Sequence, residues 1–380
     1  MQICILSPIY PTFSKPPLGI FVHEQAKYLA KKGHSVHVIT SGNHEDKSYE
    51  IKEGVVVHRI KIYNFLPFKG VIFASLMLKK LIILNKKFDF DVLHSHFVGS
   101  LTVLIGLASK LTKKRFVTTV HGIGLLTDNP IKKTMIRFYL TFPSKIICVS
   151  NYVSKLASKF TGRNKIIIVN NGVDREKLRP TLSAALFKKK LGLKNEKILL
   201  SIGALIERKG LDIILNSIPA VLKSYPNLKY FIIGKGPEKE NLTQLVKELG
   251  LEKYVVFVDG VNDNDLANFY NICDIFLLMS KTLKQKDGVE GFGIAYIEAS
   301  YFGKPIIGGK SGGTADSIVN GTTGYRIKYT DKQELVNKVL TLLKNVNLRK
   351  RLGHNGKNRV MAKFLWENIV DELVEVYKSV

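Results

Sequence analysis

Cysteine is scarce in this 380-residue chain, and tryptophan occurs only once. The three cysteines, Cys4, Cys148 and Cys273, each lie in an apolar run that is typical of a buried strand. None belongs to a Cys-x-x-Cys pair or to a Cys/His cluster, which are the usual patterns of a zinc site. The sequence therefore predicts no zinc site, and it fits a reducing cytosolic compartment.

Long uncharged hydrophobic runs are also missing. Residues 92–109 carry no formal charge, but they include histidines, serines and glycines and indicate a strand, a loop and a helix. Residues 65–87 combine apolar residues with two lysine pairs, so they fit either an interfacial helix or a buried helix with a solvated lysine edge. Residues 1–10 are expected to form a first strand rather than a signal peptide. We expect a cytoplasmic protein, and peripheral attachment to the inner face of the membrane is a further expectation.

Acidic residues are few, with 31 Asp+Glu against 58 Lys+Arg and a net charge of +27. The imbalance is greater in residues 1–175, which hold 26 basic and 9 acidic residues, or +17, whereas the remainder carries +10. A basic first half suggests an anionic partner such as lipid headgroups, polyphosphate or nucleic acid. A lysine-rich solubilising surface is the alternative explanation.

Short apolar runs alternate with helical patterns along the whole chain. The expected strands form two series: 2–7, 35–40, 55–60, 92–95, 115–120, 145–149 and 165–169, then 197–202, 229–233, 254–258, 275–279, 305–308 and 324–327. Helices, among them 21–32, 211–224 and 238–249, separate several of these strands. Apolar strands that alternate with helices indicate parallel sheets covered on both faces. The two series predict an α/β fold with two doubly wound, Rossmann-like domains that face each other across a cleft.

The domain boundary is expected in the turn-rich stretch 170–174. The first domain is therefore predicted over residues 1–174 and the second over residues 175–362. A C-terminal segment, 363–380, contains an apolar-faced helix near 366–378 that could pack on either domain, and a return to the first domain is one expectation.

The most informative stretch runs from Glu290 to Glu298 and reads Glu-Gly-Phe-Gly-Ile-Ala-Tyr-Ile-Glu. Its glycines predict a loop that enters a helix near Ile294, where unpaired N–H groups favour a bound phosphate. If the segment were wholly helical, the two carboxylates would lie about 12 Å apart. That spacing suits two parts of one long ligand better than a single scissile bond. The alternative is a helix-capping glutamate and a solvated one.

Several other loops follow strands and carry small or polar residues: 17–19, 121–122, 203–210, 234–236 and 311–313. Arg208 and Lys209 together could clamp a polyanion, although a plain surface pair is the alternative. His121 could act as an uncharged hydrogen-bond donor or be a solvated loop residue. His94 and His96 are expected on opposite faces of a strand, which would exclude a joint metal site.

The ordered series of motifs resembles retaining glycosyltransferases of family 4, which have the two-Rossmann architecture called GT-B. The similarity covers nearly the full chain. It rests on segments 19–22, 33–36, 91–96, 121–122, 171–174, 203–210, 234–237, 290–298 and 311–313. The Glu-Gly-Phe-Gly-Ile variant looks most like bacterial mannosyl- and hexosyltransferases of envelope glycolipids and polysaccharides, which favours GDP-mannose as donor.

The resemblance implies a role for each matching residue. Glu290 would hold hydroxyls of the donor sugar, and Glu298 would hold the ribose hydroxyls. Lys209 would neutralise the leaving diphosphate, His121 would face the sugar near its anomeric carbon, and Gly19 would let a loop approach. The catalytic residues implied are His121, Lys209 and Glu290. The donor-binding residues implied are Gly19, Arg208, Lys209, Gly234, Phe292, Gly293, Ile294 and Glu298. No metal and no cofactor is implied.

Three positions depart from the family pattern. Ala204 stands where an arginine is usual, and Arg208 is a candidate to replace that cation. Leu18 stands beside Gly19 where two glycines are common, and residues 314–316 read Thr-Ala-Asp where Pro and Glu are common. These departures concern the phosphate contacts and leave the class unchanged.

The function implied is transfer of a hexose, with retention, from a nucleotide-diphosphate sugar to an acceptor hydroxyl. The donor would be GDP-mannose or a UDP-sugar, and the acceptor a sugar, a lipid-linked glycan or an envelope glycan. An anionic membrane surface is a further expected partner, and nucleic acid is not. One alternative is a nucleotide-sugar epimerase on the same architecture. The other is a non-enzymatic basic protein that binds nucleic acid or membrane.

Overall fold

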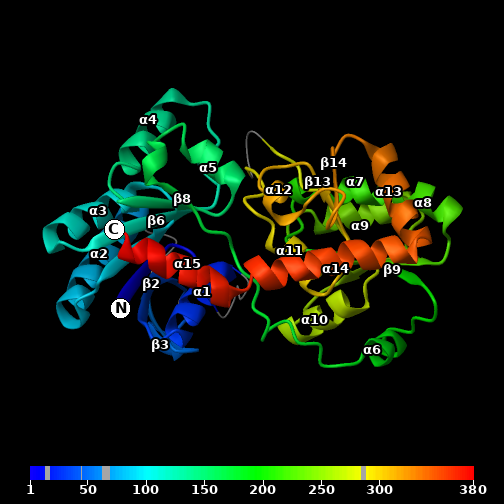
Figure 1. The fold of residues 1–380 in the computed structure, drawn as a ribbon, viewed down its shortest axis with the longest axis horizontal. Helices are drawn as coiled ribbons and strands as arrows, with labels where there is room; N and C mark the ends of the chain where they lie inside the picture. Colours follow the sequence, from blue (N-terminus) through cyan, green and yellow to red (C-terminus); the bar gives the residue numbers. More distant parts are fainter. Residues whose placement is uncertain (13–17, 44, 62–68, 284–287) are drawn as a thin grey trace. The chain divides into compact units, whose positions relative to one another are not determined.

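The chain forms two compact units in a computed structural model that describes residues 1–12, 18–43, 45–61, 69–283 and 288–380. Unit 1 comprises Met1–Gly172 and Trp366–Val380, and unit 2 comprises Val173–Leu365 (Figure 1). The chain therefore passes from unit 1 to unit 2 and returns. Both passages lie within three residues of the boundaries expected at 174 and 362.

Unit 1 is built on an eight-stranded sheet with the order β3-β4-β2-β1-β5-β6-β7-β8. All neighbouring strands pair in parallel except β3, which is antiparallel to β4. The strands are β1 (Gln2–Ser7), β2 (Ser35–Gly42), β3 (Tyr49–Lys52), β4 (Val55–Lys61), β5 (Val92–His96), β6 (Arg115–Val120), β7 (Lys145–Cys148) and β8 (Ile166–Ile168).

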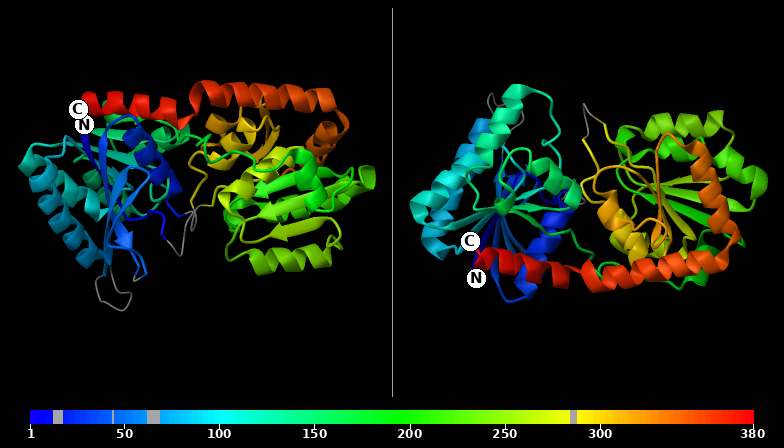
Figure 2. Two further views of the ribbon diagram at one scale, coloured as in Figure 1. Left: turned by 90° about the horizontal axis from the view of Figure 1, so that it is seen from below. Right: turned by 45° about the horizontal axis from the view of Figure 1, so that its top comes forward.

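Helices cover both faces of this sheet because successive strand residues point to opposite sides. Ile3 and Ile5 of β1 pack with apolar residues of α1 (Ile20–Lys31) and α15 (Trp366–Lys378). Cys4 and Leu6 of the same strand pack with α2 (Lys69–Phe88) and α3 (Ser100–Thr112). Figure 2 shows α2 and α3 in cyan on one side of the sheet. The remaining helices of the unit are α4 (Pro130–Tyr139) and α5 (Asn151–Ala157).

Unit 2 has a six-stranded, fully parallel sheet with the order β11-β10-β9-β12-β13-β14. Its strands are β9 (Lys197–Ile202), β10 (Leu228–Ile233), β11 (Val255–Val258), β12 (Ile275–Leu278), β13 (Ile306–Gly309) and β14 (Gly324–Ile327). Its helices are α6 (Ala184–Lys190), α7 (Leu211–Leu215), α8 (Ile218–Ser224), α9 (Lys239–Glu248), α10 (Asp263–Ile272), α11 (Ile294–Tyr301), α12 (Thr314–Ser317), α13 (Lys332–Lys344) and α14 (Val346–Lys363). The predicted fold class, two α/β domains with parallel sheets, is confirmed.

One strand was not predicted, and one local prediction was wrong. Strand β3 was not among the predicted strands because its residues, Tyr-Glu-Ile-Lys, form no continuous apolar run. The single helix predicted over 211–224 is two helices, α7 and α8. Pro219 lies in the first turn of α8, where its missing N–H is tolerated, and it could not have continued the ladder of a helix that began at Leu211.

The last helix belongs to unit 1 although it follows the whole of unit 2 in sequence. Its residues Trp366, Ile369, Val370 and Leu373 are buried in the core shared with α1. The indole N–H of Trp366 donates to Glu24 on α1 at 2.8 Å. No helix in the described part of the chain is long and apolar enough to cross a membrane.

Candidate functional site in unit 2 and a histidine row in unit 1

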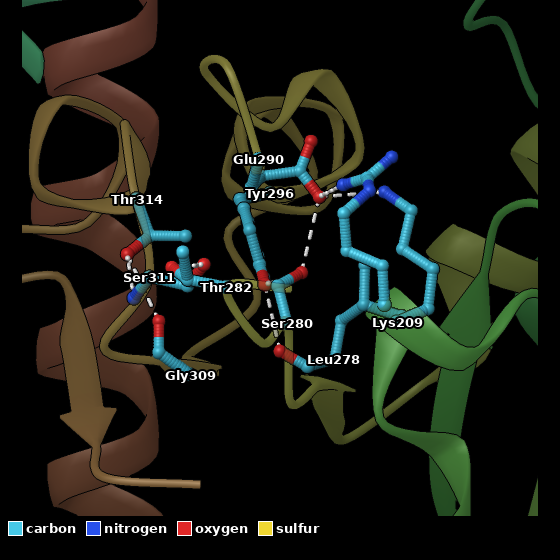
Figure 3. A network of polar contacts seen from close by, with 10 residues as sticks. Lys209, Leu278, Ser280, Thr282, Glu290, Tyr296, Gly309, Ser311 and Thr314 are labelled. Atoms are coloured by element: carbon cyan, nitrogen blue, oxygen red, sulfur yellow. Dashed lines mark hydrogen bonds and ion pairs between the residues drawn. The ribbon is translucent and has the colours of Figure 1, made fainter. Parts of the chain in front are cut away.

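The carboxylate of Glu290 lies at the centre of a cluster of polar contacts in unit 2 (Figure 3). Its Oε2 atom accepts hydrogen bonds from Lys209 Nζ at 2.7 Å, Arg208 Nη1 at 3.0 Å and Ser280 Oγ at 3.0 Å. Lys209 and Arg208 lie on a 3-10 turn that follows β9, and Ser280 follows β12. The sequence prediction placed Glu290, Arg208 and Lys209 in one site, and the structure brings these three side chains together.

The neighbouring cations determine the protonation state of the Glu290 carboxylate. Burial alone would raise the pKa of Glu290, but the adjacent Lys209 and Arg208 outweigh burial and lower the pKa to about 2. Glu290 is therefore ionised at neutral pH. All three hydrogen bonds reach one oxygen, and Figure 3 shows the other carboxylate oxygen turned away from them. The second oxygen can accept hydroxyl groups of a ligand.

Two residues that the sequence analysis did not select support Glu290. Ser280 Oγ lies 3.1 Å from the hydroxyl of Tyr296, and this hydroxyl donates to the carbonyl of Leu278 at 2.7 Å. Both side chains are fully buried. Ser280 could have been found from the sequence as the first polar residue after the apolar run 275–279. Tyr296 could not, because an aromatic residue inside a helix usually indicates packing.

The loop after β13 joins the same site. The N–H of Gly313 donates to the carbonyl of Glu290 at 2.7 Å. Ser311 Oγ contacts Thr282 Oγ1 at 2.9 Å, and Thr314 Oγ1 donates to the carbonyl of Gly309 at 2.9 Å. These contacts join the loops that follow β12 and β13, next to the turn after β9. Carboxyl ends of adjacent parallel strands are the usual place for ligands in such sheets.

Gly293 turns the chain into α11. Its φ is 92°, and a Cβ at this position would lie 2.3 Å from the ring of Tyr296. The backbone N–H groups of Phe292, Gly293 and Ile294 make no hydrogen bond within the described residues. Phe292 itself is buried and packs on Phe364. The entrance to α11 therefore presents consecutive N–H groups of the kind that bind phosphate.

Glu298 lies in the second turn of α11, as the sequence analysis expected. One of its oxygens accepts a hydrogen bond from the hydroxyl of Tyr270 at 2.7 Å. Burial, together with the charge of Glu298, raises the pKa of Tyr270, so this hydroxyl remains a donor at neutral pH. Tyr270 was also not selected from the sequence. Its place on α10, far away in sequence, carries no local signal.

Gly234 is required by close backbone packing. A Cβ on Gly234 would lie 1.9 Å from the carbonyl oxygen of Gly203, in the loop after β9. Ala204, which follows Gly203, is exposed. Arg208 and Lys209 both reach Glu290, so two cations are present in this loop region although position 204 has no charge.

The remaining predicted site residues, Gly19 and His121, belong to unit 1. Gly19 has a φ of 74° at the start of α1, and a Cβ there would lie 2.8 Å from the carbonyl of Ile9. His121 follows β6, and burial lowers its pKa to about 3, so its imidazole is neutral. The rings of Phe21 and Phe97 lie 4.5 Å and 5.0 Å from the ring of His121.

One prediction about histidines was wrong. His94 and His96 do not lie on opposite faces of β5, because residues two apart in a strand share a face. Their rings stack with centroids 4.6 Å apart. Within the described residues, no group of three or more His, Cys, Asp or Glu could hold a metal ion. Asp287, an acidic residue three positions before Glu290 in the sequence, lies outside the described residues.

Comparisons with known proteins connect these features to a family. The profile described as Glycosyltransferase Family 4 matches residues 18–177, and that of Glycosyl transferases group 1 matches residues 183–359. The two matches together span nearly the whole of both units.

Relatives and solved structures agree. N-acetyl-alpha-D-glucosaminyl L-malate synthase of Bacillus anthracis is 27% identical over 368 residues, covering 95% of this chain and 93% of the relative. A GDP-mannose-dependent alpha-(1-6)-phosphatidylinositol monomannoside mannosyltransferase of Mycolicibacterium smegmatis is 27% identical over 292 residues, or 76% of each chain.

Among solved structures, sucrose-phosphate synthase of Thermosynechococcus elongatus has a TM-score of 0.82 at 19% identity, covering 100% of this chain and 99% of that chain. Anabaena HepE in complex with UDP also has a TM-score of 0.82, at 18% identity, with 100% of both chains covered. Such likeness shows the fold, and the matched profiles and relatives show the enzyme class. The chain belongs to the family 4 glycosyltransferases with the GT-B fold, and it is a glycosyltransferase that uses nucleotide-sugar donors.

Proposed function

We propose that the protein transfers a hexose from a nucleotide-diphosphate sugar to an acceptor hydroxyl, with retention at the anomeric carbon. The observation that carries this proposal is the Glu290 cluster, in which two cations contact one carboxylate oxygen and leave the other for sugar hydroxyls. Lys209 and Arg208 also lie near the entrance of α11, through their contact with Glu290. A diphosphate group placed there would meet both cations and backbone N–H groups.

The proposed chemistry follows from where charge develops. When the bond between the anomeric carbon and the diphosphate breaks, negative charge collects on the diphosphate oxygen. Lys209, Arg208 and the N–H groups of Gly293 and Ile294 would stabilise that charge in a site shielded from water. Glu298, held by Tyr270, would bind the ribose hydroxyls. His121 keeps the role that the resemblance implies, a contact with the donor sugar.

The names of relatives and neighbours support two donor classes. The mycobacterial relative is named as GDP-mannose-dependent, and the Anabaena neighbour is in complex with UDP. Purified protein should therefore be incubated with UDP-, GDP- and ADP-sugars while nucleotide release is followed. Release of nucleotide from one donor supports the proposal. Conversion of the donor to an isomeric nucleotide sugar, without release, would instead indicate an epimerase.

Retention is tested separately once a donor and an acceptor are known. Proton NMR of the first product formed distinguishes the two anomers before they equilibrate. A product with the configuration of the donor supports retention, and the opposite configuration would show inversion.

We further propose that the acceptor is lipid-linked and that unit 1 docks on an anionic membrane, on the cytoplasmic side. Helix α2 buries Met77, Leu81 and Leu84 in the core, so the expected buried helix is present. Its opposite face exposes Leu76, Ile82 and Ile83 together with Lys79, Lys86 and Lys87.

The neighbouring helices continue this surface. Helix α3 contacts α2, and it exposes Leu107 and Leu111 beside Lys110. Helix α4 contacts α3 and exposes a row of three apolar residues four and three positions apart, together with Lys132 and Arg137. The row consists of Ile131, Met135 and Phe138. Apolar side chains beside basic ones fit the interface of an anionic bilayer.

A further inference from the structure

A row of three histidine rings leads from His121 into the interior of unit 1. The rings of His121 and His96 are stacked with centroids 5.3 Å apart, and those of His96 and His94 lie 4.6 Å apart. At the inner end, the hydroxyl of Tyr377 on α15 lies 2.7 Å from Nδ1 of His94. Burial lowers the pKa of each ring, to about 3 for His94 and His121 and well below the ordinary value for His96. Each ring is therefore neutral and carries one N–H.

The contacts of His94 fix the position of its proton. The side-chain amide nitrogen of Gln25 lies 3.3 Å from Nδ1 of His94, and an amide nitrogen can only donate. Nδ1 of His94 therefore accepts, and the proton resides on Nε2. From there it is donated to Thr119 Oγ1 at 2.7 Å.

Within the described residues, the ring of His96 has a single hydrogen bond, between its Nδ1 and Nε2 of His121 at 3.1 Å. Its own Nε2 is buried without a partner. If His121 donated to His96, the proton of His96 would lie on this isolated Nε2 and leave a buried N–H unsatisfied. If His96 donates, only a bare nitrogen is left there. Buried N–H groups without a partner are the rarer of the two kinds of unsatisfied group.

We propose that His96 is a positioning residue that donates its Nδ1–H to Nε2 of His121 and so holds the proton of His121 on Nδ1. That nitrogen of His121 makes no hydrogen bond within the described residues. His121 then presents an N–H donor, so the group it meets is an acceptor such as a sugar hydroxyl oxygen. The inference rests on the proposed role of His121 at the donor sugar and names the direction of that contact.

The first test is direct and requires no substrate. Long-range proton–nitrogen NMR of ¹⁵N-histidine-labelled protein reports which ring nitrogen of each histidine is protonated. His121 and His96 should show protonated Nδ1, whereas His94 should show protonated Nε2. Each signal is assigned to a histidine by its loss in a variant in which only that histidine is replaced. Protonated Nε2 on His121 in the wild-type protein would overturn the inference.

The second test uses two substitutions of His96 and a matched control. His96→Leu removes the donor, so the Nδ1–H form of His121 should be lost and kcat/KM for the donor should fall about tenfold, the effect of one hydrogen bond. His96→Asn keeps an N–H near the position of Nδ1 and should restore most of the activity. A purely space-filling role predicts the reverse order, because leucine fills the volume of the ring better than asparagine does.

The control is His37→Leu. His37 and His58 form another buried histidine pair of unit 1, with the same 3.1 Å contact, on strands β2 and β4. This variant should leave both the NMR signals of His121 and the donor kinetics unchanged. Thermal unfolding of all variants shows that they are folded. The NMR result stands even if His121→Ala retains full activity, which would refute the proposed role of His121 and leave the hydrogen-bond assignment intact.

Discussion

Three hydrogen-bond donors contact one carboxylate oxygen of Glu290. We therefore expect activity to depend on the negative charge of this residue. Glu290→Gln keeps the size of the side chain but leaves Lys209 and Arg208 without their anionic partner. We expect kcat to fall roughly 30- to 1,000-fold, since a charged contact made mainly in the transition state is worth about 2–4 kcal/mol. Nucleotide release under saturating donor measures the change.

Glu207→Gln is the matched control, because Glu207 lies on the same 3-10 turn and is exposed. It should keep wild-type turnover. Equal rates for Glu290→Gln and the wild type would remove Glu290 from the mechanism.

Much of this site could be predicted at the level of single residues. Glu290, Arg208 and Lys209 lie in loops whose glycines and charges are visible in the sequence. Ser280 and Tyr296 were missed because their role depends on β12 and α11 lying side by side, which no local pattern encodes. The relation between His94 and His96 was misjudged although strand periodicity alone would have placed both on one face.

Helix α11 depends on a glycine at its entrance. Gly293→Ala would place a Cβ 2.3 Å from the ring of Tyr296, which cannot move easily because it is buried and its hydroxyl is bonded to Leu278. Positive φ alone costs about 1–2 kcal/mol for a residue with a side chain. The clash should add to this cost. Urea unfolding should therefore show a decrease of more than about 2 kcal/mol in the free energy of unfolding.

Gly321→Ala separates the two effects. Gly321 has a φ of 76°, but a Cβ at that position meets nothing within 4 Å. In this variant, the free energy of unfolding should decrease only by the cost of the positive φ. If both substitutions destabilise the protein equally, the clash with the ring of Tyr296 is not the reason why Gly293 must be a glycine.

Helix α2 carries the charge that the membrane proposal requires. The triple change Lys79→Gln, Lys86→Gln and Lys87→Gln should weaken binding to vesicles that contain anionic lipid, because each lysine near such a surface contributes on the order of 1 kcal/mol. Cosedimentation should also decrease from 50 to 500 mM salt, over which the screening length falls roughly threefold.

A triple change in unit 2 provides the comparison. Lys189, Lys190 and Lys194 are likewise exposed, so their replacement by glutamine alters the net charge by the same amount. It should leave vesicle binding nearly unchanged. Protein that stays in the supernatant with anionic vesicles at low salt would refute the membrane proposal and favour a soluble acceptor.

At the level of secondary-structure elements, the periodicity of apolar residues predicted the parallel strands and the main helices. It missed β3, a four-residue strand in which Tyr49 and Ile51 alternate with the charged Glu50 and Lys52 and which pairs with β4. Periodicity also failed to predict the break between α7 and α8. The helical pattern of apolar residues continues there, but Pro219 has no N–H for the hydrogen bond that a continuous helix requires.

For the whole molecule, the distribution of histidines predicts that acid weakens unit 1 first. Unit 2 contains one histidine, His354, which is exposed, whereas burial lowers the pKa of several histidines in unit 1. The pKa is lowered to about 3 in His94 and His121, and to about 4 in His58 by burial and by the nearby His37. The unfolded chain takes up these protons near pH 6.5, before the folded chain does.

Stability should therefore decrease as the pH falls below about 6.5, by about 1.4 kcal/mol per pH unit for each such histidine until its folded pKa is reached. Fluorescence of Trp366, the single tryptophan, reports unit 1. Its denaturant midpoint should be lower at pH 5 than at pH 7, and His58→Gln should reduce the difference. Identical midpoints at the two pH values would contradict the neutral, buried state of these rings.

The return of the chain to unit 1 also sets an order of events during synthesis. The ribosome makes the whole of unit 2 before it makes α15, whose Trp366 and Tyr377 complete the core of unit 1 and the histidine row. Residues 1–172 must wait for residues 366–380, which follow the whole of unit 2 in the chain. The half of the enzyme that is translated first is therefore the half that matures last, and a prematurely terminated chain carries a finished unit 2 but an open unit 1.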